Sequence, residues 1–263
     1  MDENRNSQSP MTVSPTRLSW QYVKSVGLSI VGLMLAFGSW SDTKQLSISL
    51  YHSAISNFTH NVELAQLDKL DVGNYLPFAE LTFGTPQVIK TSRLIEGVQF
   101  RYHKNNKYLL TLIVKNEIIE GYIVESLMMF ENLGLPGQFQ PPVPFLEAFL
   151  GQQPFDKFTF PDNGLWLDTA NLVYFIEQHQ MGAPGLFLNV FLGYIEHERH
   201  HDTSAEMLVK LDQALIYDNM EATETSLSNF RRHQVPNLYA VSKHTGSIVA
   251  EALLTKYEFN TYF

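Results

Sequence analysis

Apolar side chains recur at near-helical spacing from Ser41 to Leu70, with a polar interruption at 57–61. This spacing predicts helical structure on both sides of the interruption. Between Gly73 and Gly84 the pattern predicts one short amphipathic helix, because a glycine there can cap a helix and Pro86 cannot continue it.

The pattern then changes to the shorter period that is typical of strands. Strands are expected at Gly97–His103, Tyr108–Lys115 and Ile118–Ser126, with a hairpin turn at 104–107 between the first two. Residues 42–130 are therefore predicted to form a small module with helices and a three-stranded antiparallel sheet.

The C-terminal half has a helical pattern again. Prolines gather in residues 131–161, which we interpret as a linker. Helical spacing then predicts a layer of antiparallel helices over 162–263. The expected helices are Leu165–Gly182, Pro184–His201, one that starts at Asp202-Thr203-Ser204 and runs to Arg232, and one from Leu238 to about Tyr257. The octapeptide at 144–151 shares four positions with that at 77–84, but no further repeat supports a duplication.

The N-terminus holds the most apolar run. Residues 1–19 are polar and are expected to form a disordered cytoplasmic tail. The uncharged run from Ser25 to Ser41 is long enough, at the lower limit, to cross a bilayer, and aromatic residues flank it. We expect residues 20–41 to be a single transmembrane anchor. More basic residues precede than follow it, which predicts a cytoplasmic N-terminus and an extracytoplasmic remainder.

Two alternatives for this run remain open. Small residues around Phe37 suit a signal peptidase, so the segment is also consistent with a cleaved signal peptide. It is also consistent with an apolar helix through which a soluble protein assembles with itself or a partner.

Composition narrows the function classes. The chain has 18 Lys and Arg against 27 Asp and Glu, for a net charge of −9. This balance argues against a nucleic-acid partner, which would require a basic surface. The chain has no cysteine, so disulfides, thiolate metal sites and cysteine nucleophiles are excluded.

The sharpest chemical motif is His197-Glu198-x-x-His201. On a helix this spacing places two imidazoles on one face for zinc, with Glu198 as general base and Glu221 as a candidate third ligand. Arg199 and His200 occupy positions that zinc hydrolases normally keep uncharged. The competing interpretation is a solvated helix end whose histidines complement the helix dipole.

Other polar and aromatic residues have simpler interpretations. Asp162, Asp168 and Glu177 are expected to serve turns and caps rather than to form a carboxylate pair. The basic group at 231–233 is too small to indicate nucleic acid. The tail at 257–263 is expected to pack or dock. A helically spaced aromatic stripe is predicted to be core: Trp166, Tyr174, Phe175, Phe187, Phe191 and Tyr194.

One region resembles the SmpA/OmlA family of outer-membrane-assembly lipoproteins. The matching motifs are Val72-Gly73, Phe83-Gly84-Thr85-Pro86, Tyr102 and Leu112-Ile113-Val114-Lys115-Asn116, within 67–125. The resemblance implies helices packed on a short antiparallel sheet and a role in assembly. That family is anchored by a lipidated N-terminal cysteine, which this chain lacks, so a transmembrane helix would replace the lipid.

We therefore expect an α+β fold with an N-terminal transmembrane helix, a three-stranded sheet module and a helical C-terminal layer. The expected function is a non-catalytic, membrane-anchored interaction or assembly module on the extracytoplasmic side, with another protein as partner, no cofactor and no catalytic residues. The alternatives are the zinc-dependent hydrolase and the soluble assembly protein described above.

Overall fold

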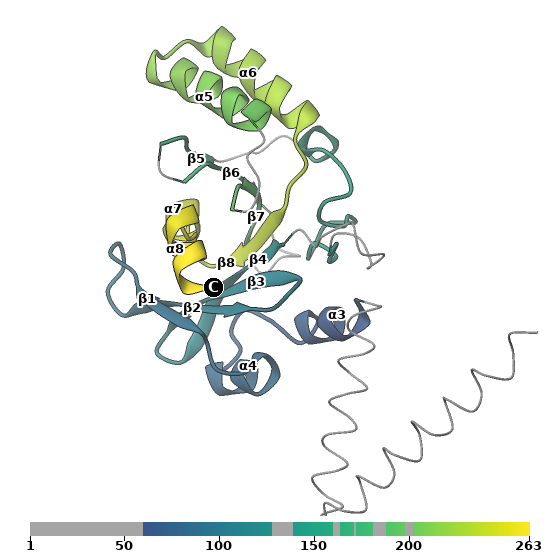
Figure 1. The fold of residues 1–263 in the computed structure, drawn as a ribbon, viewed down its shortest axis with the longest axis vertical. Helices are drawn as coiled ribbons and strands as arrows, with labels where there is room; N and C mark the ends of the chain where they lie inside the picture. The colour runs from purple at the N-terminus through teal and green to yellow at the C-terminus, as the bar shows by residue number, and fades with distance from the viewer. Residues whose placement is uncertain (1–59, 128–138, 160–163, 171, 181–187, 198–201) are drawn as a thin grey trace, which may run out of the picture. The chain divides into compact units, whose positions relative to one another are not determined.

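Strands from both halves of the chain join in one antiparallel sheet of eight strands, in the order β1-β2-β3-β4-β8-β7-β6-β5 (Figure 1). The computed structural model describes residues 60–127, 139–159, 164–170, 172–180, 188–197 and 202–263. The strands are β1 (Val88–Thr91), β2 (Val98–Lys104), β3 (Tyr108–Lys115), β4 (Ile118–Ser126), β5 (Leu165–Asp168), β6 (Tyr174–Gln180), β7 (Asn189–Ile195) and β8 (Leu238–Ser242).

Six α-helices are present in the described part of the chain. They are α3 (Asn61–Leu67), α4 (Leu76–Phe83), α5 (Asp202–Ile216), α6 (Met220–His233), α7 (Gly246–Ala252) and α8 (Lys256–Tyr262), with a 3₁₀ turn, η2, at Phe155–Lys157. The α5–α6 hairpin is inserted between β7 and β8, so β8 returns to the sheet only near the end of the chain.

The sheet consists of two similar four-stranded sets that meet at the β4–β8 pair. Each set runs from an edge strand, β1 or β5, to a central one, β4 or β8. Tyr122 of β4 faces Val241, and Tyr239 of β8 faces Val124. Each tyrosine also has a leucine as its partner on the other neighbouring strand, on β3 and β7 respectively. The two octapeptides that share four residues do not repeat a structure, since 77–84 belongs to α4 and its C-cap while 144–151 forms turns.

Both faces of the sheet are covered. Helices α3 and α4 cover one face of the first set, and α5 and α6 cover the same face of the second. Helices α7 and α8 pack on the opposite face, where Tyr102 Oη of β2 donates to the Ala252 carbonyl oxygen at 2.9 Å. The central strands are consequently buried on both sides.

The eight-stranded sheet overturns the predicted fold class. The sheet has eight strands rather than three, and the expected helical layer of the C-terminal half is wrong. Six of the seven residues of β7 are buried, so its sequence shows a continuous apolar run without the alternation that identifies a half-exposed strand. Within the expected helix Leu165–Gly182 the described residues form β5 and β6, and within the expected helix Pro184–His201 they form β7. The expected helix from Leu238 divides into β8, α7 and α8.

Other local predictions are confirmed. The short helix ending before Gly84 is α4, and the three predicted strands are β2, β3 and β4 within one residue at each end. The helix expected from Asp202 exists, but it ends at Ile216. Asp218 has a φ of 50° and Asn219 caps α6 by accepting from the Ala222 amide at 3.0 Å, so the chain turns there and starts a second helix.

The predicted linker at 131–161 contributes residues to the core, whereas the structure does not describe the predicted anchor at 20–41. Within 131–161, Phe139, Leu150 and Phe155 are fully buried in the core of the sheet. The expected anchor at 20–41 lies outside the described residues. Among the residues that the structure describes, no helix has both the length and the apolar character needed to cross a membrane.

Candidate functional site: a pocket over the central strands

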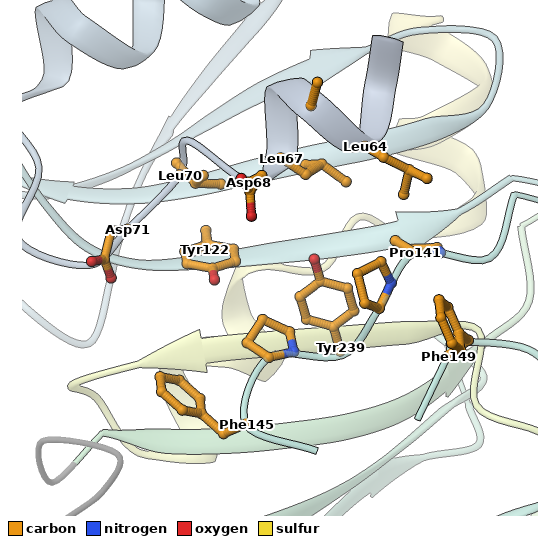
Figure 2. Close-up of a pocket in the computed structure, with 13 residues that line it drawn as sticks. Leu64, Leu67, Asp68, Leu70, Asp71, Tyr122, Pro141, Phe145, Phe149 and Tyr239 are labelled. Carbon is orange, nitrogen blue, oxygen red and sulfur yellow. The ribbon is translucent and has the colours of Figure 1, made fainter. Parts of the chain in front are cut away.

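A pocket of about 560 Å³ lies over the β4–β8 pair, where the two halves of the sheet meet (Figure 2). Tyr122 and Tyr239 form its floor. One wall is the end of α3 and the turn after it, and the other is the segment from Pro141 to Phe149. We call this the central pocket.

The floor is built from two buried tyrosines. Tyr122 and Tyr239 are 5% and 3% exposed, and their ring centroids lie 6.4 Å apart in an edge-to-face arrangement. Burial raises the pKa of both phenols above their ordinary value, with a further contribution at Tyr122 from the Asp71 carboxylate. In the described part of the chain, neither hydroxyl makes a hydrogen bond to another side chain or to the backbone. Because the pKa of each phenol is raised, both hydroxyls stay protonated. Because they have no partner there, both can donate to or accept from a ligand.

The α3 wall is fixed to the sheet by a buried ion pair. Glu63 of α3 and Lys107, which precedes β3, approach to 2.9 Å, with side chains 7% and 3% exposed. Leu64 and Leu67 of α3 line the pocket above this anchor point. Such a pair holds the helix in one position, since separating the charges would leave both in an apolar setting.

The opposite wall presents two phenylalanines. Phe145 and Phe149 are 51% and 47% exposed, and both line the pocket. Phe145 has a φ of 65°, a left-handed conformation that is unfavourable for a bulky residue. The turn is held by the Pro142–Phe149 bridge and by the Gly151 amide, which donates to the Pro236 carbonyl oxygen at 3.1 Å. The fold therefore maintains exposed aromatic rings in a strained turn beside the pocket.

Negative charge marks the rim of the pocket. Asp68, at the C-cap of α3, and Asp71, in the following turn, are both exposed. No lysine or arginine is among the described residues that line this pocket. The electrostatic potential at the rim therefore favours neutral and cationic ligands over anionic ones.

The first residue of the His197-Glu198-x-x-His201 motif does not lie on a helix. His197 follows β7 and is 4% exposed; its Nε2 lies 3.2 Å from Glu125 Oε2, and its ring stacks on Phe259 at a centroid distance of 4.5 Å. Glu198 and His201 lie outside the described residues. Glu221 is exposed in the first turn of α6. Across the described ranges, no three His, Asp or Glu side chains are grouped closely enough to hold a metal ion.

Most of the other residues singled out in the sequence lie in a turn, in a buried ion pair or in the core. Asp168 ends β5 and accepts from the Ala170 amide at 2.7 Å, as a turn residue does. Glu177 is fully buried and pairs with Arg231 and His179, while Asp162 lies outside the described residues. In the aromatic stripe, Phe175, Phe191 and Tyr194 are core residues as predicted, Trp166 and Tyr174 are partly buried against the core, and Phe187 lies outside the described residues.

A comparison with protein-family models, with curated proteins and with solved structures finds no match to this chain. The candidate site thus depends on geometry alone. Sequence reasoning misses the central pocket because the pattern predicts a helix at Tyr239 and a separate module around Tyr122. The available signal is the cluster of prolines and phenylalanines at 141–149, whose composition also fits a linker.

Proposed function

We propose that this protein is a membrane-anchored, extracytoplasmic binding module that holds apolar side chains of a protein partner in the central pocket. The observation that carries the proposal is the pocket itself, an apolar concavity over two tyrosines whose hydroxyls have no partner in the described structure. Binding sites commonly combine an apolar lining with a few polar groups that fix orientation.

The rim of the pocket supports a protein partner. Phe145 and Phe149 remain about half exposed beside the opening, where they extend the apolar surface beyond the pocket itself. Exposed aromatic side chains around a buried centre are typical of protein interfaces, because a partner that covers them removes apolar area from water. The anchor, residues 20–41, would keep this surface close to a membrane.

Filling the pocket should abolish binding of an apolar probe. Ala65 lines the pocket and is exposed on α3, so Ala65→Trp places an indole at the pocket without removing a core residue. We expect the full-length variant to bind 4-phenylbutan-1-ol at least tenfold more weakly than the wild type. Binding can be followed by ¹⁹F NMR of 3-fluorotyrosine introduced at Tyr239, in phosphatidylcholine nanodiscs, with the free probe concentration measured.

Ser228→Trp is the matched control, because it adds the same ring at an exposed position of α6 that does not line the pocket. This variant should bind the probe as the wild type does. An unchanged Tyr239 signal in the wild type at millimolar probe would contradict the proposed function.

The anchor and its orientation are tested separately. A reporter that is active only outside the cytoplasm, fused after Phe263, should be active, and the full chain should remain in the membrane fraction after salt and carbonate washes. A cytoplasmic C-terminus would overturn the extracytoplasmic location. Recovery of the chain in the soluble fraction would instead overturn the anchor.

A further inference from the structure

We infer that the partner segment held by the central pocket carries a lysine or arginine next to its apolar anchor side chain. This inference rests on the proposed function and names the chemistry of the partner. It follows from the charges at the rim, from the aromatic lining and from the net charge of the chain.

The two rim carboxylates are not neutralised by cations of the described part of this chain. Figure 2 shows Asp68 directed from the end of α3 toward the space above the tyrosines, with Asp71 farther along the same side. Neither forms an ion pair with any residue in the described ranges; the Asp71 carboxylate accepts only from the neighbouring Val72 amide, at 2.8 Å. Asp68 also occupies the C-terminal end of a helix, where the helix dipole disfavours negative charge. A cation from a partner would pair with these carboxylates and would offset the unfavourable position of Asp68 at the helix end.

The aromatic lining suits the same ligand. Tyr122, Tyr239 and Phe149 all line the pocket, so a side chain that enters it would contact aromatic rings. Aromatic faces attract ammonium and guanidinium groups in addition to apolar surface. A lysine or arginine next to the apolar side chain can therefore lay its methylene groups on the exposed rim aromatics while its charge reaches the carboxylates.

These features favour a basic side chain over a phospholipid head group. Choline and ethanolamine head groups also carry a cation, but they bring a phosphate within a few bonds of it. That phosphate would lie beside Asp68 and Asp71 with no lysine or arginine in the described pocket lining to receive it. The net charge of −9 would in addition steer basic partners toward the molecule.

Three probes with the same phenylbutyl body separate charge from apolar contact: 4-phenylbutylamine, 4-phenylbutan-1-ol and 4-phenylbutanoate. Full-length protein in phosphatidylcholine nanodiscs should bind the amine about fivefold more tightly than the alcohol, as expected for partly exposed charge pairs. The carboxylate should bind most weakly. The preference for the amine should decrease as salt is added.

The double variant Asp68→Asn/Asp71→Asn should bind the amine and the alcohol equally, with the alcohol unaffected. Glu221→Gln/Glu224→Gln removes the same charge from exposed positions on α6 and should keep the full preference. Soluble dihexanoylphosphatidylcholine should not displace the amine.

The outcomes distinguish the two proposals. Equal binding of amine and alcohol by the wild type would overturn the inference and leave the pocket as a binding site. Retention of the preference in the Asp68→Asn/Asp71→Asn variant, or displacement of the amine by the short phosphatidylcholine, would also overturn it. Absence of binding by all three probes would reject the proposed function itself.

Discussion

Replacing Arg231 with methionine is expected to lower the free energy of unfolding by about 3–5 kcal/mol, the range for breaking a buried ion pair from one side. Arg231 is 5% exposed on α6, and its Nε lies 3.0 Å from Oε2 of Glu177, which is fully buried on β6. Methionine preserves most of the side-chain volume but leaves the carboxylate in the core without the guanidinium.

The same guanidinium holds a loop in place. Its Nη2 lies 2.9 Å from the carbonyl oxygen of Phe155 and 3.1 Å from that of Phe158. These contacts connect α6 to η2, and η2 leads toward edge strand β5. The substitution should therefore also loosen 155–159, which hydrogen exchange would detect as faster exchange of those amides.

Arg232 provides the matched control, because it is the next residue of α6 and is exposed. Arg232→Met should change stability by less than about 0.5 kcal/mol. Denaturant unfolding monitored by tryptophan fluorescence measures both variants. In the double variant Arg231→Met/Glu177→Gln, the loss should be smaller than the sum of the single losses. Equal losses for Arg231→Met and Arg232→Met would contradict the assignment of the buried pair.

A second large effect is expected at low pH from His103. This residue lies on β2 beneath α4, is 4% exposed and faces the Phe83 ring at a centroid distance of 6.4 Å. Burial lowers its pKa to about 4; the Phe83 carbonyl raises it and the Arg101 guanidinium lowers it further, both by less. Arg101 is itself paired with Glu80 of α4 at 2.8 Å. Within the described structure, neither ring nitrogen makes a hydrogen bond of normal geometry.

Because the pKa is lower in the folded state than in the unfolded state, folding favours the neutral imidazole. This group costs no stability above about pH 6.5, and stability decreases as the pH falls from 6.5 to 4, where the unfolded chain binds the proton first. The full difference is about 3–4 kcal/mol, at about 1.4 kcal/mol for each pH unit within that window.

His103→Gln and His103→Leu should both remove this part of the pH dependence. The leucine variant should also be more stable at pH 7, by about 1 kcal/mol, because it removes a buried polar group whose ring nitrogens make no hydrogen bond of normal geometry in the described structure. Urea unfolding between about pH 4 and pH 8 measures the free energies. Parallel curves for the wild type and both variants would show that His103 does not titrate as the structure implies.

The elements that could be predicted from the sequence are those whose own residues mark where they begin or end, through turns and caps. Strand β2 alternates over most of its length and a polar turn follows it, and α4 has a glycine C-cap, so each could be recognised from its own residues. Strands β6, β7 and β8 could not, because their burial depends on helices that pack on both faces of the sheet. A continuous apolar segment such as β7 fits a buried strand and a buried helix equally well.

The candidate site was beyond sequence reasoning for a related reason. Its floor combines Tyr122 and Tyr239, which are far apart in the chain and adjacent only through the β4–β8 pairing. Asp68 and Phe149 join them only after α3 and the 141–149 turn pack over that pair. By contrast, the His197 motif is contiguous and easily noticed in the sequence. Its first residue nevertheless has a packing role, because it lies between Glu125 of β4 and Phe259 of α8.

The late position of β8 in the chain has a consequence for biosynthesis. Strand β8 separates β4 from β7, so the first four strands expose an unpaired central edge until residues 238–242 are available. An open edge of that length is a template for pairing with other chains. During synthesis the β4 edge must therefore stay unpaired until β8 has followed the α5–α6 hairpin, and we expect the nascent chain to be prone to aggregation at that edge during this interval.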